Sequence, residues 1–329
     1  MIINILIYSL ISFLAFFSIS KVSYNLNLIE IPNKRKIHLK ATAYTGGIGL
    51  SLIYIFALFL FDFSSEKLNF ILSTAFLIGI VGFVDDKYDL NAGGKLSLQI
   101  IPIIYLIILE NLNLNSIGNY NYFKLELNSF SIPFTLIAIL FLINSFNYFD
   151  GLDGVLSFSI ISTLAILFFL IPNENIKLFL IIILIPILFF LCFNFSIFKL
   201  PKLFLGDSGS LLLGFVIAFT LIYLSIEKIV HPILLAFSVS IFAYEFLSIN
   251  IIRLKNKKKI FDAGQDHLHH LLFKYTKSIF QTNLFISLAN IILFIFGYTS
   301  FLLISPLASL ILFIILFIIF FILRNKYSN

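Results

Sequence analysis

The sequence predicts an all-α, polytopic integral membrane protein with about eleven transmembrane helices. Of its 329 residues, 60% are hydrophobic and 12% are charged, whereas soluble domains have about 45–50% apolar and about 25% charged residues. The apolar residues also gather in long runs, and a spanning helix needs roughly 20 of them. These two observations exclude an ordinary soluble domain, a disordered chain and a fibrous protein.

Eleven apolar runs are expected to form the helices. In chain order they cover residues 2–20, 47–63, 68–84, 95–110, 130–147, 154–171, 176–195, 208–225, 230–252, 283–303 and 305–323. Between the fourth and fifth runs, NYNYFKLEL alternates as a short β-hairpin does. No soluble domain is recognisable between the runs, so residues 1–329 are expected to form a single transmembrane domain.

Basic residues in the short loops predict the orientation. Eighteen of the 22 lysines and arginines fall in the first loop, in alternate loops after it and in the tail, against four in the other loops. Because cytoplasmic loops carry this excess, the N-terminus is expected outside and the C-terminus in the cytoplasm. The net charge of +6 then reflects topology, with the lipid bilayer rather than nucleic acid as the partner.

Acidic residues and histidines gather at membrane edges on the predicted cytoplasmic side. Four clusters follow or precede the apolar runs: Asp85, Asp86 and Asp89; Asn147, Asp150 and Asp153; Asp207; and Asp262, Asp266, His267, His269 and His270. The acids of the opposite side stand mostly alone. This asymmetry predicts one polar, metal-capable site built from several helix ends.

The first and third clusters suit an anionic ligand. Asp85 and Asp86 would end a helix, where a carboxylate is unfavourable unless a metal or a lysine compensates it. Lys95 returns to the same side of the membrane and can bind an anion. Asp207 opens the eighth run, where backbone N–H groups attract phosphate. An ordinary N-cap explains Asp207 equally well, and both interpretations stay open.

The second and fourth clusters suit a hard metal. Asn147, Asp150 and Asp153 recur every three residues and would share one face if they are helical. Such oxygen ligands favour Mg²⁺, with Mn²⁺ as the alternative; a polar turn is the structural alternative. The three histidines lack a fourth local ligand for zinc. Together the clusters indicate a diphosphate, a divalent cation and a second substrate reached from the bilayer, which is the setting of phosphoryl transfer.

Five motifs, in order, carry a resemblance to a known family. They are PNKRKIHLKATAYTGGIG, FVDDKYDL, NSFNYFDGLDG, FLGDSGS and HLHH. The chain resembles, over almost its whole length, the polyprenyl-phosphate N-acetylhexosamine-1-phosphate transferases (glycosyltransferase family 4), the group that holds the WecA, TagO, WbpL and MraY enzymes. The resemblance implies a single catalytic domain in the bacterial inner membrane, with its active site in the cytoplasmic loops.

The implied reaction joins a UDP-N-acetylhexosamine to undecaprenyl phosphate. It gives undecaprenyl-diphosphate-sugar and UMP, with Mg²⁺ as cofactor, and it initiates a surface polysaccharide of the O-antigen, enterobacterial common antigen or teichoic acid type. The implied catalytic residues are Asp85, Asp86, Asp150, Asp153, His267, His269 and His270. The implied substrate-binding residues are Lys40, Lys95, Asn147, Phe204 and Arg253, and the implied metal ligands are Asp207 and Asn147. A homodimer is a further expectation.

Single residues decide the branch of the family. Leu268 interrupts the histidines, as in the WecA, TagO and WbpL type, whereas the MraY type has three in succession. Ala43 stands where the first loop usually has proline, and Gly264 and Gln265 stand where an acid and a base usually precede the histidines. The donor sugar therefore stays open.

Three alternatives from other classes remain. A secondary transporter of an acidic solute predicts ionisable residues near the midplane, and only Glu245 lies deep in a run. A CDP-alcohol phosphotransferase would have Ala-Arg after its Asp-Gly, where this chain continues LDGVLS. A catalytically inactive scaffold would lack some of the acids. A phospho-MurNAc-pentapeptide transferase of the MraY type is the alternative within the family.

Overall fold

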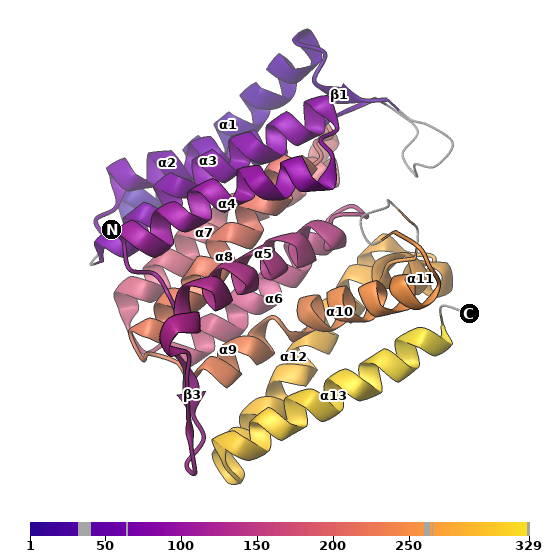
Figure 1. Cartoon of the computed structure of the whole chain (residues 1–329). Helices are drawn as coiled ribbons and strands as arrows, with labels where there is room; N and C mark the ends of the chain where they lie inside the picture. The colour runs from indigo at the N-terminus through magenta and orange to yellow at the C-terminus, as the bar shows by residue number, and fades with distance from the viewer. Residues whose placement is uncertain (32–40, 64, 260–263, 265, 328–329) are drawn as a thin grey trace. The chain divides into compact units, whose positions relative to one another are not determined.

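A computed structural model of the chain is almost entirely helical (Figure 1), and it describes residues 1–31, 41–63, 65–259, 264 and 266–327. The helices in these residues are α1 (Ile2–Asn25), α2 (Gly46–Leu60), α3 (Glu66–Tyr88), α4 (Ala92–Leu109), α5 (Ser131–Phe149), α6 (Val155–Leu170), α7 (Glu174–Asn194), α8 (Gly206–Ile226), α9 (Pro232–Ser238), α10 (Ser240–Lys255), α11 (Leu268–Thr276), α12 (Ile279–Leu303) and α13 (Pro306–Lys326). The strands are β1 (Ile29–Glu30), β2 (Thr42–Ala43), β3 (Ser116–Asn119) and β4 (Lys124–Glu126). Lys40, a predicted substrate-binding residue, lies outside the described residues.

The all-α, polytopic membrane fold is confirmed. In the described part of the chain, 8 helices are long and apolar enough to cross a membrane, or 9 if the bent pair α9 and α10 is one span. The helices α2 and α6 are also apolar but shorter. Each of the eleven predicted runs therefore forms a helix or a helix pair, while the number of spans and their orientation stay predictions.

The chain packs as two compact units. The first unit comprises Met1–Leu106 and Asn173–Ile217, and the second comprises Ile107–Pro172 and Ala218–Asn329. Two of the three boundaries fall inside α4 and α8, and the third falls between α6 and α7. Each unit takes its two segments from distant parts of the chain. The division therefore does not split the sequence into consecutive domains, and the single domain stays a prediction.

In the first unit, α1, α2 and α3 lie side by side (Figure 1), and α7 packs on α1 and α2. Pro186 lies inside α7, where it removes the hydrogen bond to the carbonyl of residue 182. The buried hydroxyl of Tyr8 donates to that carbonyl at 3.1 Å, and Tyr54 donates to the carbonyl of Ile183 at 3.1 Å. Tyr8 thus supplies the hydrogen bond that the proline removes, as a spanning helix requires.

Glycines bring the start of α8 against α2 and α3. A Cβ on Gly47 would collide with the backbone of Ser208 and Gly209, and one on Gly82 would collide with the backbone of Asp207 and Ser208. The three helices therefore meet backbone to backbone, which only residues without a side chain allow. This contact sets where the first turn of α8 lies.

In the second unit, the predicted helix over 230–252 is wrong as a continuous element. It is two helices, α9 and α10, bent by 72° at Val239. Asn290 of α12 covers the break: its Nδ2 donates to the carbonyl of Ser238 at 3.0 Å, and its Oδ1 accepts from the N–H of Ile241 at 3.4 Å. A buried amide from another helix thus satisfies backbone groups that the bend releases.

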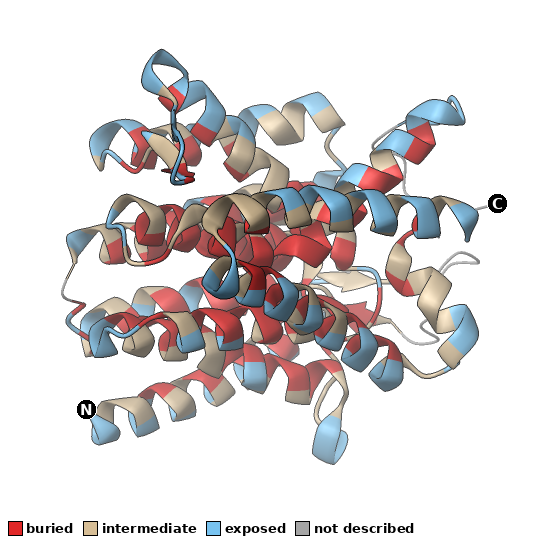
Figure 2. Ribbon diagram, turned by 90° about the horizontal axis from the view of Figure 1, so that it is seen from below, coloured by how far each residue is buried: buried red, intermediate tan, exposed pale blue. Residues whose placement is uncertain are grey.

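The remaining elements of the second unit flank this core. The strands β3 and β4 pair antiparallel, which confirms the predicted hairpin. The helix α13 packs on α10 and α12. Figure 2 shows the helix that leads to the C-terminus mostly exposed or half-buried. Exposed leucine and isoleucine side chains on α13 are expected to face lipid in a membrane.

Candidate active site

In the first unit, three helix ends bring together acids and one lysine. Asp85 lies in the last turn of α3, Lys95 in the first turn of α4 and Asp207 in the first turn of α8. The Nζ of Lys95 lies 2.7 Å from Oδ2 of Asp85 and 2.5 Å from Oδ2 of Asp207. Lys95 is therefore the compensating cation for Asp85.

Asp86 has a different partner, the N-terminus of α8. Its Oδ1 accepts the N–H of Asp207 at 2.8 Å and its Oδ2 accepts the N–H of Ser208 at 3.1 Å. A carboxylate in this place offsets the positive end of the helix dipole. Asp86 therefore binds two of the N–H groups that the sequence offered to phosphate.

Gly206 makes this cap possible. Its φ of +71° lies in the left-handed region, and a Cβ there would collide with the carboxylate of Asp86 and the carbonyl of Tyr44. Only glycine satisfies both the backbone conformation and the space. The motif FLGDSGS thus positions Asp207 by means of a glycine that precedes it.

The carboxylate oxygens around Lys95 can form part of a Mg²⁺ site. Within the described ranges, no three His, Cys, Asp or Glu side chains gather closely enough to hold a metal by themselves. Asp85 and Asp207 nevertheless present carboxylate oxygens to the same ammonium group, and Mg²⁺ usually takes one or two carboxylates and completes its shell with phosphate and water. The residues fit a magnesium ion that is held jointly with a phosphate substrate.

The second unit holds the other predicted clusters. Asn147 lies in the last turn of α5, Asp150 caps its C-terminus and Asp153 follows in a turn. The three residues therefore do not share a helical face, because the helix ends at Phe149 and Gly154 adopts a φ of +74°. The side chain of Asn283 donates to the carbonyl of Asp153 at 2.8 Å and ties this turn to α12.

The histidines lie against this turn. His267 directly precedes α11, and His269 is buried in its first turn. The ring of His267 packs edge-on to Tyr148 at 5.0 Å between centroids. A Cβ on Gly151 would collide with the ring of His269. The structure thus brings the motifs NSFNYFDGLDG and HLHH together, as the sequence predicted for one site.

The charge states of this cluster follow from its surroundings. Burial, and after it the charge of the nearby Arg253, lowers the pKa of His267 to about 3. Burial alone would raise the pKa of Asp266, but the hydrogen bonds and charge of Arg253 outweigh it and bring the pKa to about 2. At neutral pH His267 is therefore neutral and Asp266 is ionised. Nδ1 of His267 and Nε2 of His269 are buried without a hydrogen-bond partner among the described residues, and in the tautomer that protonates it either nitrogen can donate to an anion.

Other predicted residues have partners of their own. Arg253 is buried, pairs with Asp266 at 2.7 Å and lies over the ring of Tyr148. Phe204 is half-buried with Lys202 over its ring. Asn147 and Asp207, the two predicted metal ligands, belong to different units. The sequence analysis did not predict that Asp266 pairs with Arg253. The position of Asp266, one residue before the histidines, could have indicated that a basic residue would be needed nearby.

Comparison with known proteins finds a family model that covers three of the five motifs. Residues 68–225 match the family model described as Glycosyl transferase family 4. A relative from Bacillus subtilis, named probable undecaprenyl-phosphate N-acetylglucosaminyl 1-phosphate transferase, is 30% identical over 306 residues, which cover 90% of this chain and 83% of the relative. Relatives named undecaprenyl-phosphate alpha-N-acetylglucosaminyl 1-phosphate transferase are 26% identical in Escherichia coli O157:H7, over 83% of this chain and 76% of theirs, and in Yersinia pestis, over 89% and 82%.

Proposed function

The chain belongs to glycosyl transferase family 4, and from this premise we propose that it transfers N-acetylglucosamine 1-phosphate from UDP-N-acetylglucosamine to undecaprenyl phosphate. The products are undecaprenyl-diphosphate-N-acetylglucosamine and UMP. This is the initiating step of a cell-surface polysaccharide. The catalytic face is the cytoplasmic side of a bacterial inner membrane, and the chain crosses that membrane eleven times.

One observation in the structure carries the proposal, namely the contact of Lys95 with both Asp85 and Asp207. These residues come from three helices inside the region that matches the family. Two carboxylates and an ammonium group at one point suit a substrate that brings phosphate and a divalent cation. A pocket for a neutral solute would not need them.

The reaction requires positioning more than proton transfer. A terminal oxygen of undecaprenyl phosphate attacks the sugar-linked phosphorus of the donor, and the bond from that phosphorus to the bridging oxygen breaks as UMP leaves. A phosphate monoester has a second pKa near about 6, so the attacking oxygen is largely ionised at neutral pH. Asp85 accepts hydrogen bonds from Lys95 and from the N–H of Leu90, and we assign it to orienting Lys95.

Asp207, Lys95 and Asp86 then have separate roles. Asp207 would hold Mg²⁺, which neutralises charge on the diphosphate when bound. Lys95 binds a phosphate oxygen of the donor in exchange for one of its carboxylate partners. Asp86 keeps the first turn of α8 in place and acts on the substrate only through Asp207.

The histidine cluster supports phosphate binding in the second unit. Burial lowers the pKa of both His267 and His269, so neither ring is charged at neutral pH. His269 also has a buried ring nitrogen without a hydrogen-bond partner among the described residues. We propose that these rings and His270 orient phosphate oxygens through hydrogen bonds, next to the turn that carries Asp150 and Asp153.

The relatives favour one branch. Those in Escherichia coli, Yersinia pestis and Bacillus subtilis are named as N-acetylglucosaminyl 1-phosphate transferases, which agrees with the interrupted motif HLHH. We therefore place the chain in this branch rather than among the pentapeptide transferases, and membership of an enzyme family sets the transporter alternative aside.

The test uses purified protein in detergent with undecaprenyl phosphate and Mg²⁺. UDP-N-acetylglucosamine, other UDP-N-acetylhexosamines and UDP-MurNAc-pentapeptide are offered in turn, with UMP release and the mass of the lipid product as readouts. UMP release with UDP-N-acetylglucosamine, lost on adding EDTA and in Asp207→Asn, is the expected result. Turnover only with the pentapeptide donor would reverse the branch, and folded protein without turnover on any donor would overturn the proposed reaction.

A further inference from the structure

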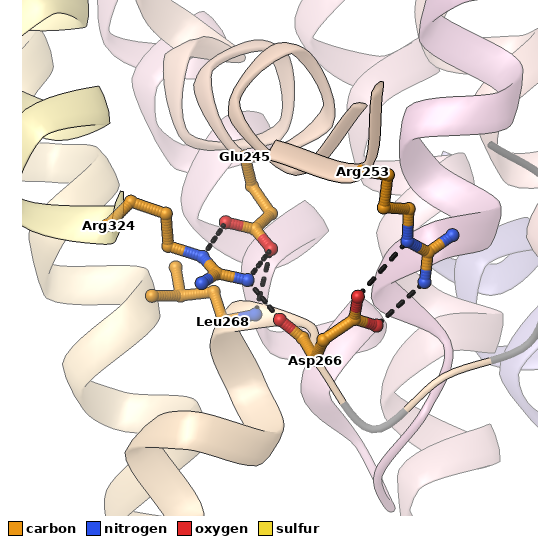
Figure 3. A network of polar contacts seen from close by, with 5 residues as sticks. All are labelled: Glu245, Arg253, Asp266, Leu268 and Arg324. Atoms are coloured by element: carbon orange, nitrogen blue, oxygen red, sulfur yellow. Dashed lines mark hydrogen bonds and ion pairs between the residues drawn. The ribbon is translucent and has the colours of Figure 1, made fainter. Parts of the chain in front are cut away.

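A buried ion pair in the second unit holds the histidine segment in place (Figure 3). Glu245 of α10 and Arg324 in the last turn of α13 are 1% and 3% exposed. Nε of Arg324 donates to Oε2 of Glu245 at 2.9 Å, and its Nη2 donates to Oε1 at 3.2 Å. The two-point geometry fixes the guanidinium and the carboxylate relative to one another.

The same two side chains bind the backbone on both sides of His267. Oε1 of Glu245 accepts the N–H of Leu268, the first residue of α11, at 2.8 Å. Arg324 also donates to the carbonyl oxygen of Asp266. Glu245 thereby puts a negative charge at the N-terminus of α11, where helix N–H groups have no partner within the helix.

A second arginine holds the segment from its other side. Arg253 of α10 binds the carboxylate of Asp266 through Nε at 3.1 Å and Nη2 at 2.7 Å. Two side chains of α10 and one of α13 therefore bind residues 266–268, as the dashed lines of Figure 3 show.

Stability alone is a poor explanation of the pair. Desolvating two charges costs about as much as their attraction returns, and apolar residues of similar size are often as stabilising. Apolar side chains, however, cannot bind the N–H of Leu268 or the carbonyl of Asp266. The ion pair therefore contributes two directed hydrogen bonds to the backbone on either side of His267. These hydrogen bonds fix the position of the rings of His267 and His269.

We propose that Glu245 and Arg324 are positioning residues that anchor the segment 266–270 and so set its histidines for the transfer reaction. This inference rests on the proposed function only where it concerns catalysis. The anchoring itself is independent of which reaction the protein performs.

The main variant replaces both charges with apolar side chains, Glu245→Leu together with Arg324→Met, because either change alone leaves one buried charge unpaired. Glu245→Gln is the second variant: it keeps an oxygen for Leu268 and removes the charge. Lys326→Met is the matched control, since Lys326 lies in the same turn of α13, is exposed and loses the same charge.

The first readout is hydrogen–deuterium exchange of peptides from 266–276 in detergent-purified protein, followed by mass spectrometry. In the double variant we expect exchange to be roughly 10- to 100-fold faster in this segment and unchanged in α12, because charge-assisted hydrogen bonds are lost locally. The control should match the wild type. Unchanged exchange in the segment, in a double variant that melts at the wild-type temperature, would overturn the anchor.

The second readout is UMP release at varied donor concentration. We expect kcat/KM to fall roughly 10- to 100-fold, with a raised KM for the UDP-sugar, because displaced groups no longer meet the substrate. Loss of folded enzyme would instead lower only the apparent kcat. Faster exchange with wild-type kcat and KM would refute the catalytic part of the inference. A wild-type protein without turnover would contradict the proposed function, and the exchange comparison would still decide whether the pair anchors the segment.

Discussion

Asp86 caps the N-terminus of α8, and replacing it should lower both the free energy of unfolding and the rate of UMP release. Asp86→Ala deletes both acceptors, leaving the N–H groups of Asp207 and Ser208 without the partners they have at 2.8 and 3.1 Å. Hydrogen bonds to a charged group contribute about 1.5–3 kcal/mol each. Lower repulsion among the neighbouring aspartates offsets part of the loss, so we expect a decrease of about 3 kcal/mol in the free energy of unfolding.

Asp86→Asn should lie between this variant and the wild type. It keeps one oxygen acceptor and loses the charge, so we expect about 1–2 kcal/mol, in the range measured for helix caps. The assay is equilibrium unfolding in mixed detergent micelles, with UMP release measured on the same preparations. Both variants should lose turnover, because the first turn of α8 carries Asp207.

Asp207→Asn is the matched comparison. Its backbone N–H, not its side chain, takes part in the cap, so its stability should stay within about 1 kcal/mol of the wild type while turnover is lost. If Asp86→Ala unfolds like the wild type and is nevertheless inactive, the capping argument is refuted. Asp86 would then act directly on the substrate.

Four further predictions concern both units. Lys95→Met should lower kcat/KM roughly 100-fold, as removal of an electrostatic contact to the reacting phosphates does, measured by UMP release. Gly151→Ala should lower turnover more than stability, because its Cβ displaces the ring of His269; melting temperature and kcat compared on one preparation check this. Asn290→Leu should reduce the free energy of unfolding by about 1–3 kcal/mol, since the buried N–H of Ile241 loses its acceptor and the carbonyl of Ser238 keeps only the hydroxyl of Thr163. Stability should fall by about 2 kcal/mol between pH 7 and pH 5 through His267, whose pKa is lowered to about 3, because the unfolded chain takes up the proton near its ordinary value of 6.5 and the folded chain does not.

The Lys95 and His267 predictions have controls of different kinds. Lys95→Arg keeps the charge and should retain more activity than the methionine variant. Unfolding of His267→Gln measured across the same pH range should show a shallower slope than the wild type. An unchanged slope would mean that His267 titrates normally in the folded protein.

The apolar pattern predicted the helices because hydrophobicity over a run of about 20 residues is a local property. The sequence also predicted that Asp85 and Asp86 need a cation, since a carboxylate at a helix C-terminus is unfavourable wherever the helix lies. The grouping of Asp85, Lys95 and Asp207 followed from topology, because all three lie at run ends assigned to one side.

Other features depend on partners distant in the sequence. The break at Val239 has no proline at that position, and its backbone groups are satisfied by Asn290, 52 residues from Ser238. Glu245 was visible as an acid in an apolar run, but its partner Arg324 lies 79 residues away. Asp86 looked equivalent to Asp85, and only the geometry shows that one binds Lys95 and the other binds α8.

The position of Arg324 also bears on how the protein is made. The carbonyl of Asp266 is held by an arginine that lies 58 residues later, and α12 together with nearly all of α13 intervenes. On the ribosome, the histidines therefore emerge well before their anchor is synthesised. At that stage the nascent chain has all of its candidate catalytic acids but lacks Arg324. The hydrogen bonds that hold residues 266–268 can form completely only when α13 has been inserted and its last turn packs beside α10.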